Sequence, residues 1–319
     1  MLTDIALFIV GLALLSWSAD RFVYGASAMA KNFGISPMVI GMTIVAMGSS
    51  APEIMVSATA SMAGNADTAV GNAIGSNITN IGLVLGLTAL FKPLMVSSGT
   101  IRREMPILLI VSLTAAWFLA DLSLSRSEGI ALMILFFVTI GGLTWLSIQA
   151  DRKDPYGTDT AEEIPSDVPT HKAIFWVMVG MVLLPISADI MVDSAVNIAR
   201  YFGMSELMIG LTIIAIGTSL PELAASIAGV LKGEDDMALG NIIGSNIFNI
   251  LAVMAMPGLI APGLIDADAA NRDIHVMLVF TVLLLLFSFG LRGVRKITRW
   301  EGGILVAGYI GYLTFLFVA

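Results

Sequence analysis

Long apolar segments dominate the chain, and short polar stretches separate them. A helix needs about 20 apolar residues to cross the hydrocarbon core of a bilayer. Ten segments fit this requirement, at residues 2–19, 37–63, 68–91, 103–120, 127–149, 172–195, 206–231, 236–260, 273–290 and 302–318. Because unpaired backbone groups cannot face lipid, each segment is predicted to be a helix. The pattern therefore predicts an all-α integral membrane protein.

The composition supports this class and excludes several others. Of the 319 residues, 57% are hydrophobic and 13% are charged, whereas a soluble domain carries about 25% charged residues. The chain has no cysteine, which excludes disulfides, thiol catalysis and thiolate metal sites. Its first residues, Met1 to Asp4, lack the basic stretch of a signal peptide, so we expect the first segment to be retained.

The basic residues indicate an orientation in the membrane. Ten spans place both termini on one side. Counted over the loops and span ends, 13 of the 16 Lys and Arg residues fall on the opposite side and 3 on the side of the termini. The positive-inside rule makes the richer side cytoplasmic. We therefore expect a multi-pass protein of the cell inner (plasma) membrane with extracytoplasmic termini and a cytoplasmic central loop.

The chain repeats itself at an offset of 169 residues. Residues 18–53 align with 187–222 without a gap, with 18 identities in 36 positions, and residues 71–80 align with 240–249 with 8 identities in 10. Each half holds five predicted spans, and because five is odd the second half enters the membrane from the opposite side. We expect a five-helix repeat at 1–150 with its motif at 41–80, a linker at 151–170, and an inverted five-helix repeat at 171–319 with its motif at 210–249. Inverted repeats with a midplane site are typical of secondary transporters.

Two of the predicted spans contain a polar sequence that apolar helices do not require. It reads GSSAPE at residues 48–53 and GTSLPE at 217–222. A carboxylate in the hydrocarbon core costs roughly 2.5–3.5 kcal/mol on insertion scales. Pro52 and Pro221 cannot donate to the carbonyl four residues earlier, so both helices are predicted to break at mid-membrane. A serine three residues before Glu53 and Glu222 matches a capping box that starts a new helical segment.

A broken helix of this kind offers oxygen ligands to a hard cation. The break is expected to release carbonyls near residues 46–49 and 215–218 beside hydroxyls and two carboxylates. Ca²⁺ accepts roughly 6–8 oxygens of these kinds, and Na⁺ could occupy the same cavity. Two alternatives stay open: the glutamates could only close capping boxes, and the hydroxyls could bond to their own helix.

The second repeated motif places amides and hydroxyls on one helix face. Asn72, Ser76 and Asn80 follow one another at spacings of four residues, and Asn241, Ser245 and Asn249 repeat the pattern. Ser76, Asn80, Ser245 and Asn249 are predicted to add oxygens to the site. For Asn72 and Asn241, interhelical hydrogen bonding without ion contact is the favoured interpretation.

Together the duplicated motifs resemble the α-repeats of the cation/Ca²⁺ antiporter superfamily, and the chain is similar to its compact prokaryotic sodium/calcium exchangers. The resemblance implies ten helices, no enzymatic activity, no cofactor, and exchange of Ca²⁺ for Na⁺ as transported substrates. It implies ion ligation by Glu53, Glu222, Ser49, Ser50, Thr218, Ser219, Ser76, Asn80, Ser245, Asn249 and the carbonyls of Ala46 and Ala215. Membrane lipid is the expected surrounding; neither nucleic acid nor an obligate protein partner is expected.

Two residues depart from the family pattern. Ser49 stands where Thr is usual, and Asn249 stands where several exchangers of the family carry Asp. The site then has only two carboxylates, which leaves the Na⁺ count open, together with H⁺-coupled or K⁺-dependent exchange. A cation channel is a more distant alternative, because broken helices also line pores. An intramembrane protease is disfavoured, since no Lys, His or Asp pair lies at mid-span.

Overall fold

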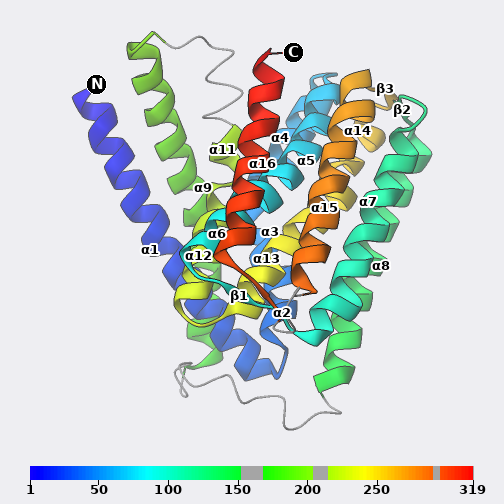
Figure 1. Ribbon diagram of the computed structural model, residues 1–319. Coiled ribbons are helices and arrows are strands. Elements are labelled where there is room, and N and C mark those ends of the chain that lie inside the picture. The colour runs from blue at the N-terminus through cyan, green and yellow to red at the C-terminus, as the bar shows by residue number, and fades with distance from the viewer. Residues whose placement is uncertain (152–167, 204–214, 290–294, 319) are drawn as a thin grey trace.

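The computed structural model describes residues 1–151, 168–203, 215–289 and 295–318. These residues form a bundle of long helices, with two small antiparallel sheets of two strands each between them. Figure 1 shows the N and C labels at one end of the bundle, whereas α8 ends and α9 begins at the opposite end. The described part of the chain is thus helical apart from four two-residue strands, in agreement with the hydropathy pattern.

The residues before the central linker form a series of helices interrupted by π-helical turns (η). In order they are α1 (Leu2–Phe33), α2 (Pro37–Ile40), η1 (Gly41–Val45), α3 (Ala46–Ser49), α4 (Ala51–Met62), α5 (Ala66–Thr79), η2 (Asn80–Leu85), α6 (Gly86–Phe91), β1 (Leu94–Met95), η3 (Thr100–Glu104), α7 (Met105–Leu119), β2 (Ser123–Leu124) and α8 (Arg126–Asp151). The predicted segment 37–63 is therefore not one helix but a run of short ones.

The residues after the linker repeat this series. The described elements are α9 (Thr170–Tyr201), α11 (Ala215–Thr218), α12 (Leu220–Leu231), α13 (Asp235–Phe248), η5 (Asn249–Val253), α14 (Ala255–Ile260), β3 (Gly263–Leu264), η6 (Ala269–Asp273), α15 (Ile274–Ser288), β4 (Lys296–Ile297) and α16 (Arg299–Val318). The start of the predicted segment 206–231 lies outside the described residues.

The first helix is much longer than the predicted segment 2–19. It continues to Phe33 and ends where Gly34 adopts a left-handed conformation with φ 62°, its N–H bonding to the carbonyls of Ala30 and Lys31. Glycine tolerates this conformation without strain, which makes it a common helix terminator. Residues 20–33 are less apolar, but this part of α1 packs against protein: a Cβ added to Gly25 would lie 2.8 Å from the carbonyl oxygen of Ala173.

Helices α1 and α9 run antiparallel along each other. At one end the Asn32 amide donates to the carbonyl of Val168 at 2.9 Å, just before α9 begins. At the other end the Asn197 amide donates to Asp4 Oδ1 at 3.3 Å. Figure 1 shows the pair standing at one side of the bundle. The two equivalent helices of the repeat therefore form one unit beside the remaining helices.

The two small sheets join linkers that are far apart in the chain. Strand β1 pairs antiparallel with β4, with Leu94 opposite Ile297, and β2 pairs antiparallel with β3, with Ser123 opposite Leu264. Each pair links one half of the chain to the other. The sequence analysis predicted no strands, because two-residue ladders leave no detectable alternation of polar and apolar residues.

The helices have the length and surface of a membrane protein. Within the described residues, six helical spans are long and apolar enough to cross a bilayer, and α2–α3 together with α4 form a further, bent span. Large apolar side chains face outward along them, including Trp117 with 80% exposure and Phe137 with 67%. Such exposure is costly in water and expected in lipid.

Candidate functional site

Both predicted helix breaks are present at the serine of each motif. Helix α3 ends at Ser49 and α4 begins at Ala51, with a bend of 48° between the two segments. Helix α11 ends at Thr218 and α12 begins at Leu220. Prolines stand in the first two positions of α4 and α12, where a missing N–H leaves no hydrogen bond unmade. The proline-based prediction of broken helices is confirmed.

The predicted capping boxes are wrong. Ser50 and Ser219 have ψ angles of 8° and 7°, and neither side chain caps its own helix. An N-cap serine normally has an extended backbone that turns its hydroxyl toward the following amides, and here ψ near zero prevents this. Instead the Ser50 hydroxyl donates to Glu222 Oε1 at 3.0 Å. The serine of one half thus contacts the carboxylate of the other half.

The predicted release of the Ala46 carbonyl is also wrong. This oxygen accepts the Ser50 N–H at 2.9 Å and the Ser49 hydroxyl at 3.4 Å. In the second half the Ser219 N–H donates to Ile216 at 3.1 Å, so the two breaks are not identical. The Ser49 hydroxyl lies closer to Asn241 Oδ1, at 3.1 Å, so it does not have to occupy the Ala46 oxygen, and ion coordination by that carbonyl stays a prediction. Coordination by the Ala215 carbonyl stays a prediction.

Two asparagines hold the backbone of the two glutamates. The Asn72 amide donates to the carbonyl of Glu53 at 3.1 Å, and the Asn241 amide donates to the carbonyl of Glu222 at 3.3 Å. Asn241 also donates to Ser226 at 3.0 Å and accepts the Ser49 hydroxyl at 3.1 Å. The expected interhelical hydrogen bonds are present, and they fix the residues that carry the carboxylates.

A second pair of asparagines marks the start of a wider helical turn. The π-helical turns η2 and η5 begin at Asn80 and Asn249. Turns of this kind interrupt the regular hydrogen-bond ladder and occur frequently at functional sites. Both side chains are fully buried, and neither amide has a hydrogen-bond partner within the described structure. These four polar atoms are free to face an added ligand.

The two carboxylates are buried without a compensating charge. Glu53 and Glu222 have no solvent exposure. Both oxygens of Glu53 and Oε2 of Glu222 have no hydrogen-bond partner, and no Lys or Arg among the described residues pairs with either glutamate. The Ser50 hydroxyl of the first motif reaches Glu222 Oε1 of the second at 3.0 Å, so the two motifs that carry the glutamates meet in the interior. Burying like charges together is strongly unfavourable, so the site requires a cation or protons.

The atoms near the carboxylates that could bind an ion are neutral oxygens. The hydroxyls of Ser49 and Ser245 lie 3.5 Å apart, and Ser219 Oγ is buried without a partner. No cluster of three acidic or histidine residues is found among the described residues, so hydroxyl, amide and carbonyl oxygens must complete any coordination shell. This donor set suits Ca²⁺ and other hard cations.

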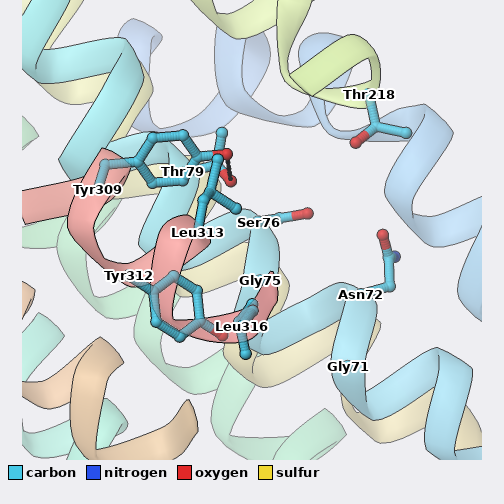
Figure 2. A pocket seen from close by; sticks show the side chains of 10 residues that line it. All are labelled: Gly71, Asn72, Gly75, Ser76, Thr79, Thr218, Tyr309, Tyr312, Leu313 and Leu316. Carbon is cyan, nitrogen blue, oxygen red and sulfur yellow. Dashed lines mark hydrogen bonds between the residues drawn. The ribbon is translucent and has the colours of Figure 1, made fainter. Parts of the chain in front are cut away.

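A cavity of about 190 Å³ leads to one side of this site. Figure 2 shows the side chains of Asn72, Ser76 and Thr218 facing the same open space between α5 and α11. The full lining consists of Gly71, Asn72, Gly75, Ser76, Thr79, Thr218, Tyr309, Tyr312, Leu313 and Leu316. The cavity therefore brings together predicted site residues from both halves.

The equivalent helices α5 and α13 differ in what covers their glycine-bearing faces. A Cβ added to Gly71 or Gly75 would meet nothing within 4 Å. At the equivalent Gly240 and Gly244 it would approach the carbonyl oxygens of Met38 and Met42 to 2.5 and 2.6 Å. Among the described residues, α2 and η1 cover this face of α13 and nothing covers the same face of α5. Residues 206–214, which the repeat aligns with α2 and η1, lie outside the described residues.

The sequence analysis did not identify Tyr309 and Tyr312 of α16. Figure 2 shows both rings beside α5, where Tyr309 pairs with the Thr79 hydroxyl at 3.3 Å. Tyr312 donates to Asp273 at 2.9 Å. The sequence feature that could have identified them is a pair of tyrosines three positions apart in a largely apolar segment. A buried tyrosine hydroxyl needs a hydrogen-bond partner, so such a pair indicates nearby polar groups.

Comparisons with known proteins assign the chain to a family. The family model described as "Sodium/calcium exchanger protein" matches residues 3–145 and 172–318. CaxA of Alkalimonas amylolytica is 58% identical over 317 residues, covering 99% of each chain. The inner membrane protein YrbG of Escherichia coli K12 is 46% identical over 319 residues, covering 99% of this chain and 98% of YrbG.

A solved structure also has the same fold. The sodium-calcium exchanger NCX_Mj, soaked with 2.5 mM Na⁺ and 0.1 mM Ca²⁺, superimposes with a TM-score of 0.84 at 32% sequence identity, covering 98% of each chain.

Proposed function

Because the chain belongs to the sodium/calcium exchanger protein family, a family of transporters rather than enzymes, we propose that it exchanges Ca²⁺ for Na⁺ across the membrane as a secondary active antiporter. One observation carries the proposal. Glu53 and Glu222 come from different halves, are fully buried, and have no cationic partner among the described residues. A mobile cation is the component that such a site lacks.

The proposed architecture is ten membrane-spanning helices in two inverted five-helix repeats. The halves are residues 1–150 and 171–319, joined by the linker 151–170. The antiparallel pairing of the equivalent helices α1 and α9 supports the inversion, as do the matching breaks at Ser50 and Ser219. Transporters built this way bind their substrate where discontinuous helices of the two repeats meet.

In this proposal the two carboxylates are shared by the competing ions. Ca²⁺ is held by Glu53 and Glu222 with help from neutral oxygens, and Na⁺ ions replace it at overlapping positions. The proposed neutral ligands are Ser49, Ser50, Thr218, Ser219, Ser76, Asn80, Ser245, Asn249 and the carbonyls of Ala46 and Ala215. The partnerless amides of Asn80 and Asn249 support this set. No resident cofactor is needed, since Ca²⁺ and Na⁺ are substrates.

Alternating access follows from the difference between the halves. The faces of α5 and α13 that carry the paired glycines are equivalent by the repeat, and among the described residues only the α13 face is covered. If the surroundings of α5 and α13 were exchanged, the cavity beside α5 would close. An equivalent cavity would then open beside α13, on the other side of the site. Helices α1 and α9 contribute no proposed ligand and pack together beside the bundle, so their joint movement is the proposed switch.

The proposed location is the cell inner membrane, with extracytoplasmic termini and a cytoplasmic linker. The excess of Lys and Arg on the linker side supports this orientation. The cavity is lined by Tyr309, Tyr312, Leu313 and Leu316 of α16, whose C-terminus lies at the end of the bundle that carries both chain ends. In this orientation the cavity lies toward the extracytoplasmic side.

Ion flux in proteoliposomes tests the proposal and its alternatives. Gradients of Na⁺, K⁺ and H⁺ are imposed one at a time while ⁴⁵Ca²⁺ uptake is measured. An outward Na⁺ gradient is expected to drive uptake, and K⁺ or H⁺ gradients are not. Uptake driven by H⁺, or only by Na⁺ and K⁺ together, would assign the corresponding coupling instead. Ca²⁺ flux without any counter-ion would indicate a channel.

A further inference from the structure

The sheet formed by β1 and β4 gathers basic residues from two distant linkers. Val96 N–H donates to the Arg295 carbonyl at 2.9 Å beside the paired strands. Residues 92–103 and 295–299 then contribute six of the 16 basic residues of the chain: Lys92, Arg102, Arg103, Arg295, Lys296 and Arg299. We call these six residues the basic clasp. They lie at the end of the bundle opposite the N and C labels in Figure 1.

Most of the positive charge of the basic clasp is not neutralised. Lys92 pairs with Asp235 at 3.3 Å and Arg103 lies 4.0 Å from Glu104. Within the described ranges, no carboxylate lies within ion-pair distance of Arg102, Arg295, Lys296 or Arg299. Arg102, Arg295 and Arg299 are exposed.

Neutral acceptors orient two of these guanidinium groups. Arg299 donates to the carbonyls of Leu90 and Phe91 at 3.0 and 3.2 Å, and Arg295 donates to the Ser98 hydroxyl. These contacts use only some of the five N–H donors of each side chain. Each guanidinium group keeps its positive charge, and its remaining N–H groups point in directions that these contacts fix. Such an arrangement is suited to binding phosphate oxygens.

Exposed apolar side chains stand next to the basic clasp. Trp300 is 81% exposed, Phe91 57% and Met95 55%. Tryptophan beside basic residues at the end of a membrane helix is typical of the headgroup level of a bilayer. A ligand that contacts both groups needs an anionic head and an apolar tail, which free phosphate does not have.

The equivalent sheet at the other end of the bundle shows that the fold does not require this charge. Beside β2 and β3 lie Asp121, Asp266 and Asp268, and Arg272 there is paired with Asp268 at 2.8 Å. The helix starts that follow β2 and β4 are alike, since Glu128 bonds Ser125 as Glu301 bonds Thr298. Acidic residues therefore predominate beside one sheet, whereas beside the other the six basic residues stand next to two carboxylates, Glu104 and Asp235.

We propose that the basic clasp binds the phosphate headgroup of an anionic phospholipid, with the acyl chains lying along Phe91, Met95 and Trp300. Clusters of Lys and Arg next to membrane helices attract anionic lipid headgroups. The site is separate from Glu53 and Glu222, so its test does not depend on transport.

Native mass spectrometry of the full-length protein tests this site with two lipids of identical acyl chains, phosphatidylglycerol and phosphatidylcholine. The wild type is expected to bind phosphatidylglycerol roughly tenfold more tightly. The double variant Arg102→Gln/Lys296→Gln changes two residues for which no side-chain hydrogen bond or ion pair is found among the described residues, and it is expected to lose this preference. Arg126→Gln is the matched control, because Arg126 holds the position equivalent to Arg299 at the other end.

Three results would overturn the proposal. They are equal binding of both lipids by the wild type, a preference that survives in the double variant, and displacement of phosphatidylglycerol by inorganic phosphate. The last result would assign a free-phosphate site. Arg295→Gln provides an independent variant, and unfolding temperatures of all variants in detergent show whether they remain folded.

Discussion

Ser50 and Glu222, 172 positions apart in the chain, are joined by a 3.0 Å hydrogen bond from the serine hydroxyl to Oε1. This contact connects the helix break of one half to the carboxylate of the other. The equivalent Ser219 hydroxyl has no hydrogen-bond partner among the described residues. The site is therefore built from both halves, and its two serines have different surroundings in the conformation described here.

Replacing Ser50 and Ser219 one at a time should distinguish a serine that stabilises the fold from a serine that only binds the ion. Ser50→Ala removes the hydrogen bond to the Glu222 carboxyl group, and a hydrogen bond of this kind contributes about 1 kcal/mol. We therefore expect a lower unfolding temperature without Ca²⁺ or Na⁺. Ser219→Ala removes no bond and should leave that temperature nearly unchanged. Both variants should bind Ca²⁺ more weakly. Equal destabilisation by the two substitutions would contradict the asymmetry.

The two glutamates should be individually necessary for transport. Glu53→Gln or Glu222→Gln removes half of the negative charge that holds the ion, and we expect Na⁺-driven ⁴⁵Ca²⁺ uptake to fall at least tenfold. Glu128→Gln is the control, since Glu128 bonds Ser125 at 2.7 Å outside the site. Uptake that survives either substitution at Glu53 or Glu222 would refute the assignment.

Asn72 and Asn241 should act by positioning the glutamates. Each hydrogen bond of this kind contributes about 1 kcal/mol. Asn72→Ala loses one such bond and Asn241→Ala loses three, so Ca²⁺ affinity should decrease in both and more strongly for Asn241. Isothermal titration measures the affinities. Asn65→Ala, at the exposed start of α5, should leave the affinity unchanged, and a larger loss for Asn72→Ala would contradict the ranking.

The equivalent glycines of α5 and α13 should respond differently to alanine. A Cβ at Gly75 meets no described atom within 4 Å, whereas a Cβ at Gly244 lies 2.6 Å from the backbone of Met42. Gly244→Ala should therefore lower the unfolding temperature, and Gly75→Ala should not. If the protein alternates as proposed, Gly75→Ala should still slow ⁴⁵Ca²⁺ flux, because α5 must close in the opposite state. Equal effects of both substitutions on stability would argue against the open cavity.

Several features of the fold could be predicted because they depend on local chemistry. Pro52 and Pro221 cannot complete a helical hydrogen bond, and the breaks lie where this predicts. The interhelical hydrogen bonding expected of Asn72 is present, since its amide donates to the Glu53 carbonyl. The length of α1 could not be predicted, because residues 20–33 are helical through packing against α9.

Other features depend on contacts that the sequence does not encode locally. The partner of Ser50 lies in the other half, so a capping box was the simpler local interpretation. The π-helical turns at Asn80 and Asn249 have no established sequence signal.

The central claim is that Ca²⁺ and Na⁺ share one binding site, and competition between the two ions tests it most directly. Ca²⁺ binding to the purified protein is titrated at several fixed Na⁺ concentrations. If Glu53 and Glu222 hold both ions at one shared site, Na⁺ should raise the apparent Kd for Ca²⁺ and leave the number of bound Ca²⁺ ions unchanged. An apparent Kd that stays constant at saturating Na⁺ would contradict a shared site.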